Sequence, residues 1–251
     1  MARRDIFNGS DRYLLDRELS DAFRIARMLG KPLLVEGEPG TGKTALAEEY
    51  SKALGLELHV FACGAESTVE QLATRFDDVQ RLTDSQALIL NAQMEAAERP
   101  ERIDLNGRRV DCLDDYVIEG PLAKAYQDPD SVLLIDEIDK APRDFPNGLL
   151  YALSSRRLII PETGRVIETT QENMPAVVIT SNREQALPAP FLRRCAYHYI
   201  PFPEAETMKK IVKLHYDGAK DAFIDAAVGV FYQLRELGLE RNPATGEMLD
   251  W

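Results

Sequence analysis

One short segment of the chain combines glycines with a lysine and a hydroxyl group. Residues 37–44 read GEPGTGKT and fit the pattern G-x-x-x-x-G-K-[ST], which joins a strand to a helix. Glycines let backbone N–H groups surround a triphosphate closely, and the following helix directs the positive end of its dipole toward it. Lys43 offers a cation for the β- and γ-phosphate oxygens, and the Thr44 hydroxyl is suited to Mg²⁺. The motif predicts a site for ATP and Mg²⁺ formed by Glu38, Pro39, Gly40, Thr41, Gly42, Lys43 and Thr44.

Two carboxylates follow a run of four apolar residues further along the chain. Residues 132–135 (VLLI) have the composition of a strand buried on both faces, and Asp136 and Glu137 come directly after them. We expect this strand to lie beside the strand that precedes the glycine loop. Asp136 would then hold the Mg²⁺ shell, and Glu137 would polarise the attacking water. This is a Walker B pattern.

Asn182 follows another apolar run, residues 177–180. We expect it between the two Walker strands, at the carboxyl edge of the sheet, where open α/β sheets bind ligands. An uncharged amide at this place can orient water against the γ-phosphate without competing for the metal.

Two arginines, Arg193 and Arg194, precede the last candidate strand. A residue that reaches into the site of a neighbouring subunit must be long, planar and permanently charged, and arginine has all three properties. Either residue could be such an arginine finger, with the other as a structural ion-pair partner. We favour Arg194.

The elements that must position these residues alternate between helix and strand. Apolar residues recur at helical spacing over residues 14–29, and residues 43–54 have a helical composition closed by Gly55. Short apolar runs of strand length lie at residues 33–35, 58–61, 132–135 and 177–180, with a weaker one at 197–200. This alternation predicts the α/β class, with an αβα sandwich around a parallel sheet as in P-loop NTPases.

Two segments interrupt the alternation, and a third ends it. Residues 64–88 are polar, and residues 157–168 contain two β-rich pieces around a glycine-containing turn, which predicts a hairpin. Ordinary insertions would explain both. After two prolines the chain becomes helical. We therefore expect a core over residues 1–200 and, over residues 201–251, the start of an all-helical domain that is incomplete.

Composition excludes several classes of protein. Forty-two acidic and 30 basic residues give a net charge of −12, which repels nucleic acid in the absence of a basic stripe. Three scattered cysteines do not form a disulfide framework or a CxxC metal site, and they favour a reducing compartment. No stretch reaches the roughly 18 apolar residues that span a bilayer. We expect a cytoplasmic protein without membrane insertion.

The motifs together resemble those of the MoxR-like AAA+ ATPases. The resemblance rests on LLVEGEPGTGKTALAEEY, VLLIDEIDKAPRDFPNGLL, VVITSNREQALPAPFLRRCAYHYIPFP and NPATGEMLDW. It implies a helical lid after the core and a homo-oligomeric, commonly hexameric ring. It also implies that residues 64–88 are the helix-2 insert and residues 157–168 the pre-sensor-1 hairpin, both facing the pore or the client.

The same resemblance implies a chaperone-like role in remodelling, assembling or activating a protein client, with a von Willebrand factor A domain protein as partner. One departure concerns the lid sensor. The chain has Asn242 where the family usually has a basic residue and Ala244 where it has serine, which leaves Arg241 as the lid cation.

Two other functions remain open from the sequence. A DNA-acting AAA+ machine, such as a helicase or clamp loader, is disfavoured by the net charge of −12. A nucleotide-dependent switch with little turnover is disfavoured by the presence of Glu137 and Asn182.

Overall fold

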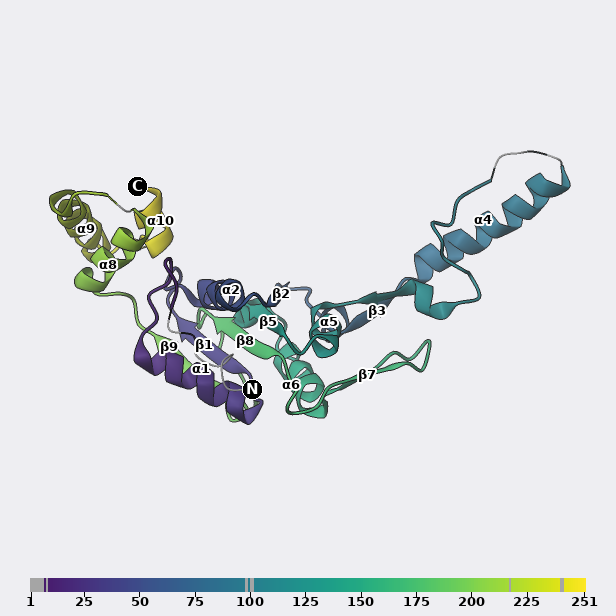
Figure 1. Ribbon diagram of the computed structural model, residues 1–251, viewed down its shortest axis with the longest axis horizontal. Coiled ribbons are helices and arrows are strands. Elements are labelled where there is room, and N and C mark those ends of the chain that lie inside the picture. Colours follow the sequence, from purple (N-terminus) through teal and green to yellow (C-terminus); the bar gives the residue numbers. More distant parts are fainter. Residues whose placement is uncertain (1–6, 8, 98, 100–101, 217, 240–241) are drawn as a thin grey trace.

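The computed structural model describes residues 7, 9–97, 99, 102–216, 218–239 and 242–251 (Figure 1). Within these residues the centre is a five-stranded sheet in the order β2-β5-β8-β1-β9, and every neighbouring pair is parallel. Its strands are β1 (Leu33–Gly37), β2 (Glu57–Ala62), β5 (Ser131–Asp136), β8 (Ala176–Ser181) and β9 (Ala196–Ile200). A parallel sheet needs crossover connections, and helices supply them.

Helices cover both faces of the sheet because its central strands are apolar on both sides. Alternate residues of β5 pack in opposite layers: Val132 lies in one apolar cluster and Leu133 in the other. The first layer contains α1 (Arg17–Leu29) and α2 (Lys43–Leu54), and the second contains α5 (Pro121–Gln127), α6 (Phe145–Ser155) and α7 (Ala189–Leu192). The predicted αβα sandwich with a parallel sheet is confirmed.

The strand order corrects one expectation. The Walker B strand β5 does not lie beside β1, because β8 pairs with both: Ile179 is opposite Leu34 on one side and Ile135 on the other. An apolar run shows that a strand is buried but not which strand it pairs with, since the crossovers decide the order. Asn182, directly after β8, does stand between the two Walker strands.

The segment after β2 forms a long excursion from the sheet, and it extends well beyond residue 88. It contains α3 (Val69–Leu72), β3 (Thr74–Phe76), α4 (Asp78–Ala96), the 3₁₀ turn η1 (Leu113–Tyr116) and β4 (Val117–Glu119). β3 pairs antiparallel with β4, so the excursion closes only near residue 119. Figure 1 shows α4 projecting away from the sheet. The expected range 64–88 was too short because the pairing that closes the excursion is not local.

One buried carboxylate joins the parts of the excursion. Asp84 on α4 is only 3% exposed. It accepts hydrogen bonds from Arg108 (Nε, 2.7 Å), from the Tyr116 hydroxyl (3.0 Å) and from Gln80 Nε2 (2.8 Å). The hydrogen bond from Arg108 is the main reason that the pKa of Asp84 falls to about 2. The network therefore ties α4 to the returning chain.

Asp84→Asn is expected to loosen the excursion without unfolding the sheet. Hydrogen exchange over β3 and β4 should become faster by about tenfold or more, because Arg108 would keep its charge without a charged partner. A carboxyl group whose pKa falls on folding stabilises the folded state at pH values above its unfolded pKa of about 3.9. In the unmodified protein, this contribution of Asp84 to stability should therefore disappear as the pH drops toward 2. The control is Glu95→Gln, which removes the exposed pair with Arg102. Equal exchange in both variants would contradict the role of Asp84.

A second, smaller hairpin follows α6. β6 (Arg157–Ile159) pairs antiparallel with β7 (Val166–Glu168), with Leu158 opposite Ile167. Both of these residues are buried in the apolar cluster of the second layer. The hairpin is therefore anchored at its base.

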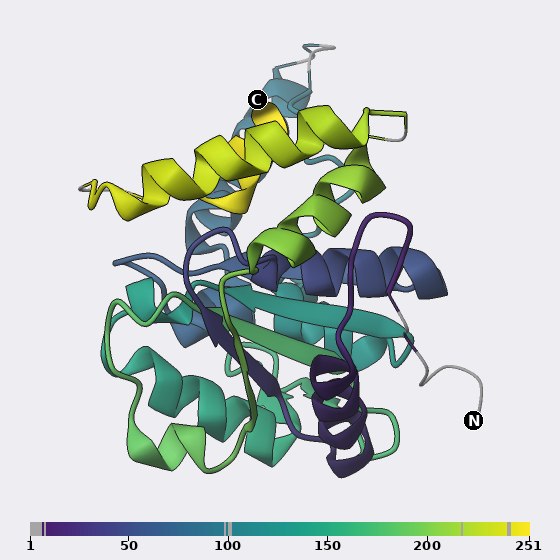
Figure 2. The same cartoon turned by 90° about the vertical axis from the view of Figure 1, so that its left-hand side faces the viewer.

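The last three helices form a unit with a small core of its own. α8 (Ala205–His215), α9 (Asp221–Glu236) and α10 (Thr245–Asp250) bury the side chains of Met208, Val212, Ile224, Val228, Phe231 and Met248. Figure 2 shows these helices above α2. Among the described residues there is no helix with the length and apolarity needed to cross a membrane.

Candidate active site

The loop between β1 and α2 requires its glycines. Gly40 and Gly42 have φ values of +77° and +86°, which side chains other than glycine rarely adopt. A Cβ on Gly37 would lie 2.5 Å from the carbonyl oxygen of Ile200. These three positions therefore require glycine. The loop leads directly into the N-terminus of α2, where backbone N–H groups are free to meet an anion.

Lys43 is buried inside this loop. Its side chain is 6% exposed, and Nζ donates to the carbonyl oxygens of Gly37 (2.9 Å) and Glu38 (2.7 Å). Desolvation lowers the pKa of Lys43, and the charges of Asp139 and Asp136 oppose that shift. The arrangement places a cation in a cradle of carbonyl groups, ready to exchange them for phosphate oxygens.

Two hydroxyl groups and one carboxylate meet next to the loop. The Thr44 hydroxyl donates to Asp136 Oδ1 at 2.9 Å, and the Thr180 hydroxyl donates to the same oxygen at 2.5 Å. Thr180 also accepts the N–H of Glu137 at 2.8 Å. Hydroxyl and carboxylate oxygens are the hard ligands that Mg²⁺ prefers, so the donor set fits this ion. Thr180 was not among the site residues predicted from the sequence, although a hydroxyl at the end of an apolar strand was a signal.

Glu137 has both carboxylate oxygens engaged. Its backbone is left-handed (φ +55°). Asn182 Nδ2 donates to Oε1 at 3.0 Å, and Lys140 Nζ donates to Oε2 at 2.6 Å. The hydrogen bond to Glu137 raises the pKa of Lys140. The structure thus brings the predicted Glu137 and Asn182 into direct contact.

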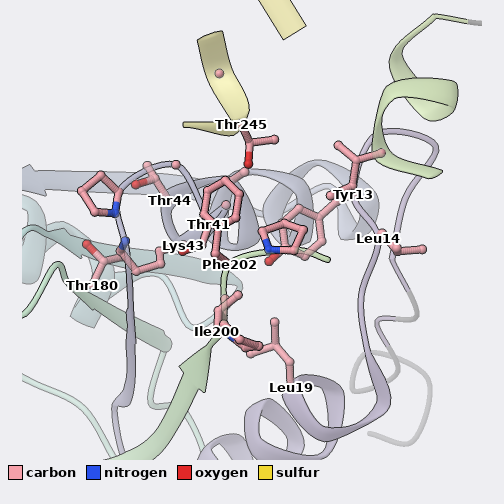
Figure 3. Close-up of a pocket in the computed structure, with 18 of the residues that line it drawn as sticks. Tyr13, Leu14, Leu19, Thr41, Lys43, Thr44, Thr180, Ile200, Phe202 and Thr245 are labelled. Carbon is pink, nitrogen blue, oxygen red and sulfur yellow. The ribbon is translucent and has the colours of Figure 1, made fainter. Parts of the chain in front are cut away.

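These polar groups line one side of a cavity of about 980 Å³. Figure 3 shows Lys43, Thr44 and Thr180 on one side and Tyr13 and Leu14 on the other, with Phe202 between them and Ile200 and Leu19 below. Burial, followed by the charge of Asp16, raises the pKa of Tyr13, so its hydroxyl stays neutral. An apolar, aromatic wall next to a phosphate cradle suits a purine base. No local motif marked the residues of this apolar, aromatic wall, which come from two separate parts of the chain, residues 13–19 and 200–202.

The C-terminal helices close the cavity from above. Thr245 and Gly246 line it, and a Cβ on Gly40 would lie 2.4 Å from the Ala244 Cβ. Arg235 Nη2 lies 2.8 Å from Glu38 Oε2, and its guanidinium lies 3.4 Å from the centroid of the Phe202 ring.

The cation that the C-terminal helices bring to the loop is therefore Arg235, within the part of the chain that is described. Arg241, the residue predicted from the sequence, lies outside the described residues. Arg235 was missed because its position in α9 gives no sign of a contact with a loop almost 200 residues earlier.

Arg193 and Arg194 lie apart from this cavity. Both are exposed and follow α7, and neither is among the residues that line the cavity. Among the residues described, no acidic group forms an ion pair with either arginine. Both side chains are therefore exposed at a surface that another molecule could contact.

Comparisons with known proteins agree with this geometry. The AAA domain of the dynein-related subfamily matches residues 32–195, which extend from the residue before β1 to the residue before β9. Midasin from Dictyostelium discoideum is 28% identical over 155 residues, which make up 60% of this chain and 2% of midasin. An uncharacterized protein of Staphylococcus haemolyticus is 25% identical over 83% of this chain and 70% of its own length.

Two further comparisons cover about half of the matched protein. An uncharacterized protein of Staphylococcus epidermidis is 30% identical over 143 residues, which are 56% of this chain and 43% of that protein. A crystal structure from Cytophaga hutchinsonii covers 90% of this chain and 54% of its own, with 14% identity and a TM-score of 0.49. The family match covers more than half of this chain and contains the glycine loop, Asp136, Glu137 and Asn182. The chain belongs to the AAA domain family, in its dynein-related subfamily.

Proposed function

We propose that the protein is an ATPase that hydrolyses Mg-ATP at the cavity between β1, β5, β8 and the C-terminal helices. The observation that carries the proposal is the contact of Asn182 with Glu137, on the edge of the sheet where Thr44 meets Asp136. A carboxylate and an amide that are held together beside a phosphate cradle are suited to activate water. A switch that only binds nucleotide does not need this pair.

Each residue has a separate task in this proposal. Lys43 and the backbone N–H groups of residues 40–44 bind the phosphates, while Thr44 and Asp136 would hold Mg²⁺. When bound, the metal neutralises negative charge that builds up on the β- and γ-phosphate oxygens. Glu137 accepts a proton from the attacking water, and Asn182 orients that water. Each Glu137 oxygen accepts one hydrogen bond in the structure, from Lys140 and from Asn182, and each keeps a lone pair that can accept from the water.

Lys43→Ala is expected to abolish measurable ATP binding. The substitution removes the buried cation of the loop and leaves the apolar layers around the sheet unchanged. Calorimetric titration with Mg-ATP measures the effect, and Lys52→Ala, an exposed lysine on the same helix, is the control. Affinity close to that of the unmodified protein, in a folded Lys43→Ala variant, would rule out the phosphate-binding role of the loop.

We further propose that hydrolysis drives the remodelling, assembly or activation of a protein client, as the resemblance to MoxR-like ATPases implies. The geometry that supports this is the pair of projections: α4 and the β6–β7 hairpin extend from the same end of the molecule, away from α8–α10 (Figure 1). A cytoplasmic homo-oligomeric ring, with six subunits, and a partner with a von Willebrand factor A domain complete this proposal.

A pull-down with the Glu137→Gln protein tests the client proposal. With ATP this variant should hold its client, because the ATP-bound state persists, and with ADP it should release it. Retention of the same protein by Lys43→Ala would show binding that does not depend on nucleotide. Salt-dependent binding of DNA instead of a protein would favour a DNA-acting machine.

A further inference from the structure

A carboxylate with no role in the mechanism above is buried beside the site. Asp139 belongs to the short 3₁₀ helix η2 (Ile138–Lys140) and is 2% exposed. Its Oδ2 accepts the backbone N–H of Asn182 at 3.1 Å and that of Glu184 at 2.9 Å. Its Oδ1 is also buried and has no hydrogen-bond partner among the described residues.

Burial of this carboxylate is costly, and the two hydrogen bonds offset the cost only in part. An apolar residue would fill the same space without an unpartnered oxygen. Besides its charge, which opposes the lowering of the Lys43 pKa, the feature that distinguishes Asp139 from an apolar residue is its hold on the backbone after β8. The contact therefore acts on the loop that carries Asn182.

The loop after β8 is held from two sides. Asp139 holds it toward the end of β5 through the N–H groups of Asn182 and Glu184. The residue between them, Arg183, has a left-handed backbone (φ +63°), and its side chain is directed the other way. Arg183 Nε lies 3.4 Å from Glu36 Oε2 on β1. The conformation of this loop is therefore strained, and it is fixed by contacts with β1 and with η2, which follows β5.

We propose that Asp139 is a positioning residue for ATP hydrolysis, which acts by holding the backbone of Asn182. With that backbone fixed, the Asn182 amide lies 3.0 Å from Glu137 Oε1 and is placed to share the attacking water with it. Asp139 itself does not touch the nucleotide in this proposal, and it does not line the cavity. The inference rests on the ATPase function proposed above.

Asp139→Ala removes the acceptor and Asp139→Asn keeps it, so the pair separates positioning from charge. An asparagine side chain has the same shape and retains an oxygen for the two N–H groups. Its nitrogen would replace Oδ1, which makes no hydrogen bond that could be lost. If the negative charge of Asp139 were what matters, both variants would be equally impaired.

The experiment measures kcat, the Kd for Mg-ATP and hydrogen exchange over residues 181–185. Asp139→Ala should lower kcat by about tenfold to a hundredfold, the scale expected when a catalytic group shifts by about 1 Å. The Kd should change less than about twofold, and exchange of the N–H groups of Asn182 and Glu184 should become faster by at least about tenfold. Asp139→Asn should restore most of kcat and the slow exchange. Asp144→Asn, an exposed carboxylate in the next turn, is the control and should resemble the unmodified protein.

A second cycle keeps the test decisive if Asp139→Ala folds poorly. Asp139→Leu fills a similar space without an acceptor, and its effect is compared in the presence and absence of Asn182→Ala. If Asp139 acts through Asn182, the loss in kcat caused by Asp139→Leu should vanish once Asn182 is replaced.

Three results would overturn the inference: an unchanged kcat in Asp139→Ala, an equal loss of kcat in Asp139→Asn and Asp139→Ala, or additive losses in the cycle. If the unmodified protein did not hydrolyse ATP, the proposed function would be contradicted instead. Hydrogen exchange at the Asn182 N–H would still report whether Asp139 holds this backbone group.

Discussion

Arg194→Ala is expected to lower ATP hydrolysis by on the order of a thousandfold while leaving ATP binding nearly unchanged. In the structure Arg194 is exposed and lies outside the cavity of its own subunit. Its guanidinium therefore cannot help to bind ATP within one chain. In a ring, it would reach the γ-phosphate of the adjacent subunit and stabilise the negative charge of the transition state.

Mixing two inactive variants tests whether the arginine acts between subunits. Arg194→Ala lacks the finger and Glu137→Gln lacks the base, so a mixed ring contains some interfaces with an intact Glu137 and an intact Arg194. We expect an equimolar mixture to regain part of the activity after the subunits have exchanged. Size-exclusion chromatography with ATP first establishes that both variants assemble.

The neighbouring arginine is the matched control. Arg193→Ala should retain most of the activity if Arg194 is the finger. If Arg193→Ala restores activity when it is mixed with Glu137→Gln, and Arg194→Ala does not, the finger is Arg193. Loss of ATP affinity in Arg194→Ala monomers would contradict a role between subunits altogether.

Glu137→Gln should bind Mg-ATP normally and lose about a hundredfold or more in kcat, since it removes a base that accepts a proton in the transition state. Glutamine keeps an oxygen for Asn182 Nδ2, so the geometry of the contact is conserved. It loses the ion pair with Lys140, which is exposed and contributes little stability. Single-turnover hydrolysis and an independent titration of ATP separate chemistry from binding.

Glu184→Gln is the control for this variant. Glu184 is an exposed acid close to Asn182, and the hydrogen bond that it makes to Asp139 comes from its backbone N–H. Its replacement should leave kcat within about twofold, because an exposed charge is screened by water and salt. If Glu137→Gln turned over within about threefold of the unmodified protein, Glu137 would not be the general base.

The sequence by itself determined the features that depend on contiguous residues. The glycine loop has its positive φ values and its lysine within eight residues, so the motif specifies both the backbone and the cation. Apolar runs that end in Asp136 and Asn182 likewise determined that the strands are buried and that their polar groups lie at one edge. The parallel αβα sandwich follows from the alternation of such runs with helices.

Only the tertiary structure decided which distant residues meet. The strand order placed β8 between β1 and β5, which brought Thr180 to Asp136 and Asp139 to the backbone of Asn182. Arg235 reached Glu38 only because α8–α10 fold back over the glycine loop. Contacts such as these depend on strand order and helix packing, which arise from the burial of many side chains at once. A local pattern determines the chemistry that a segment can offer, whereas the fold of the whole chain determines the groups with which it acts.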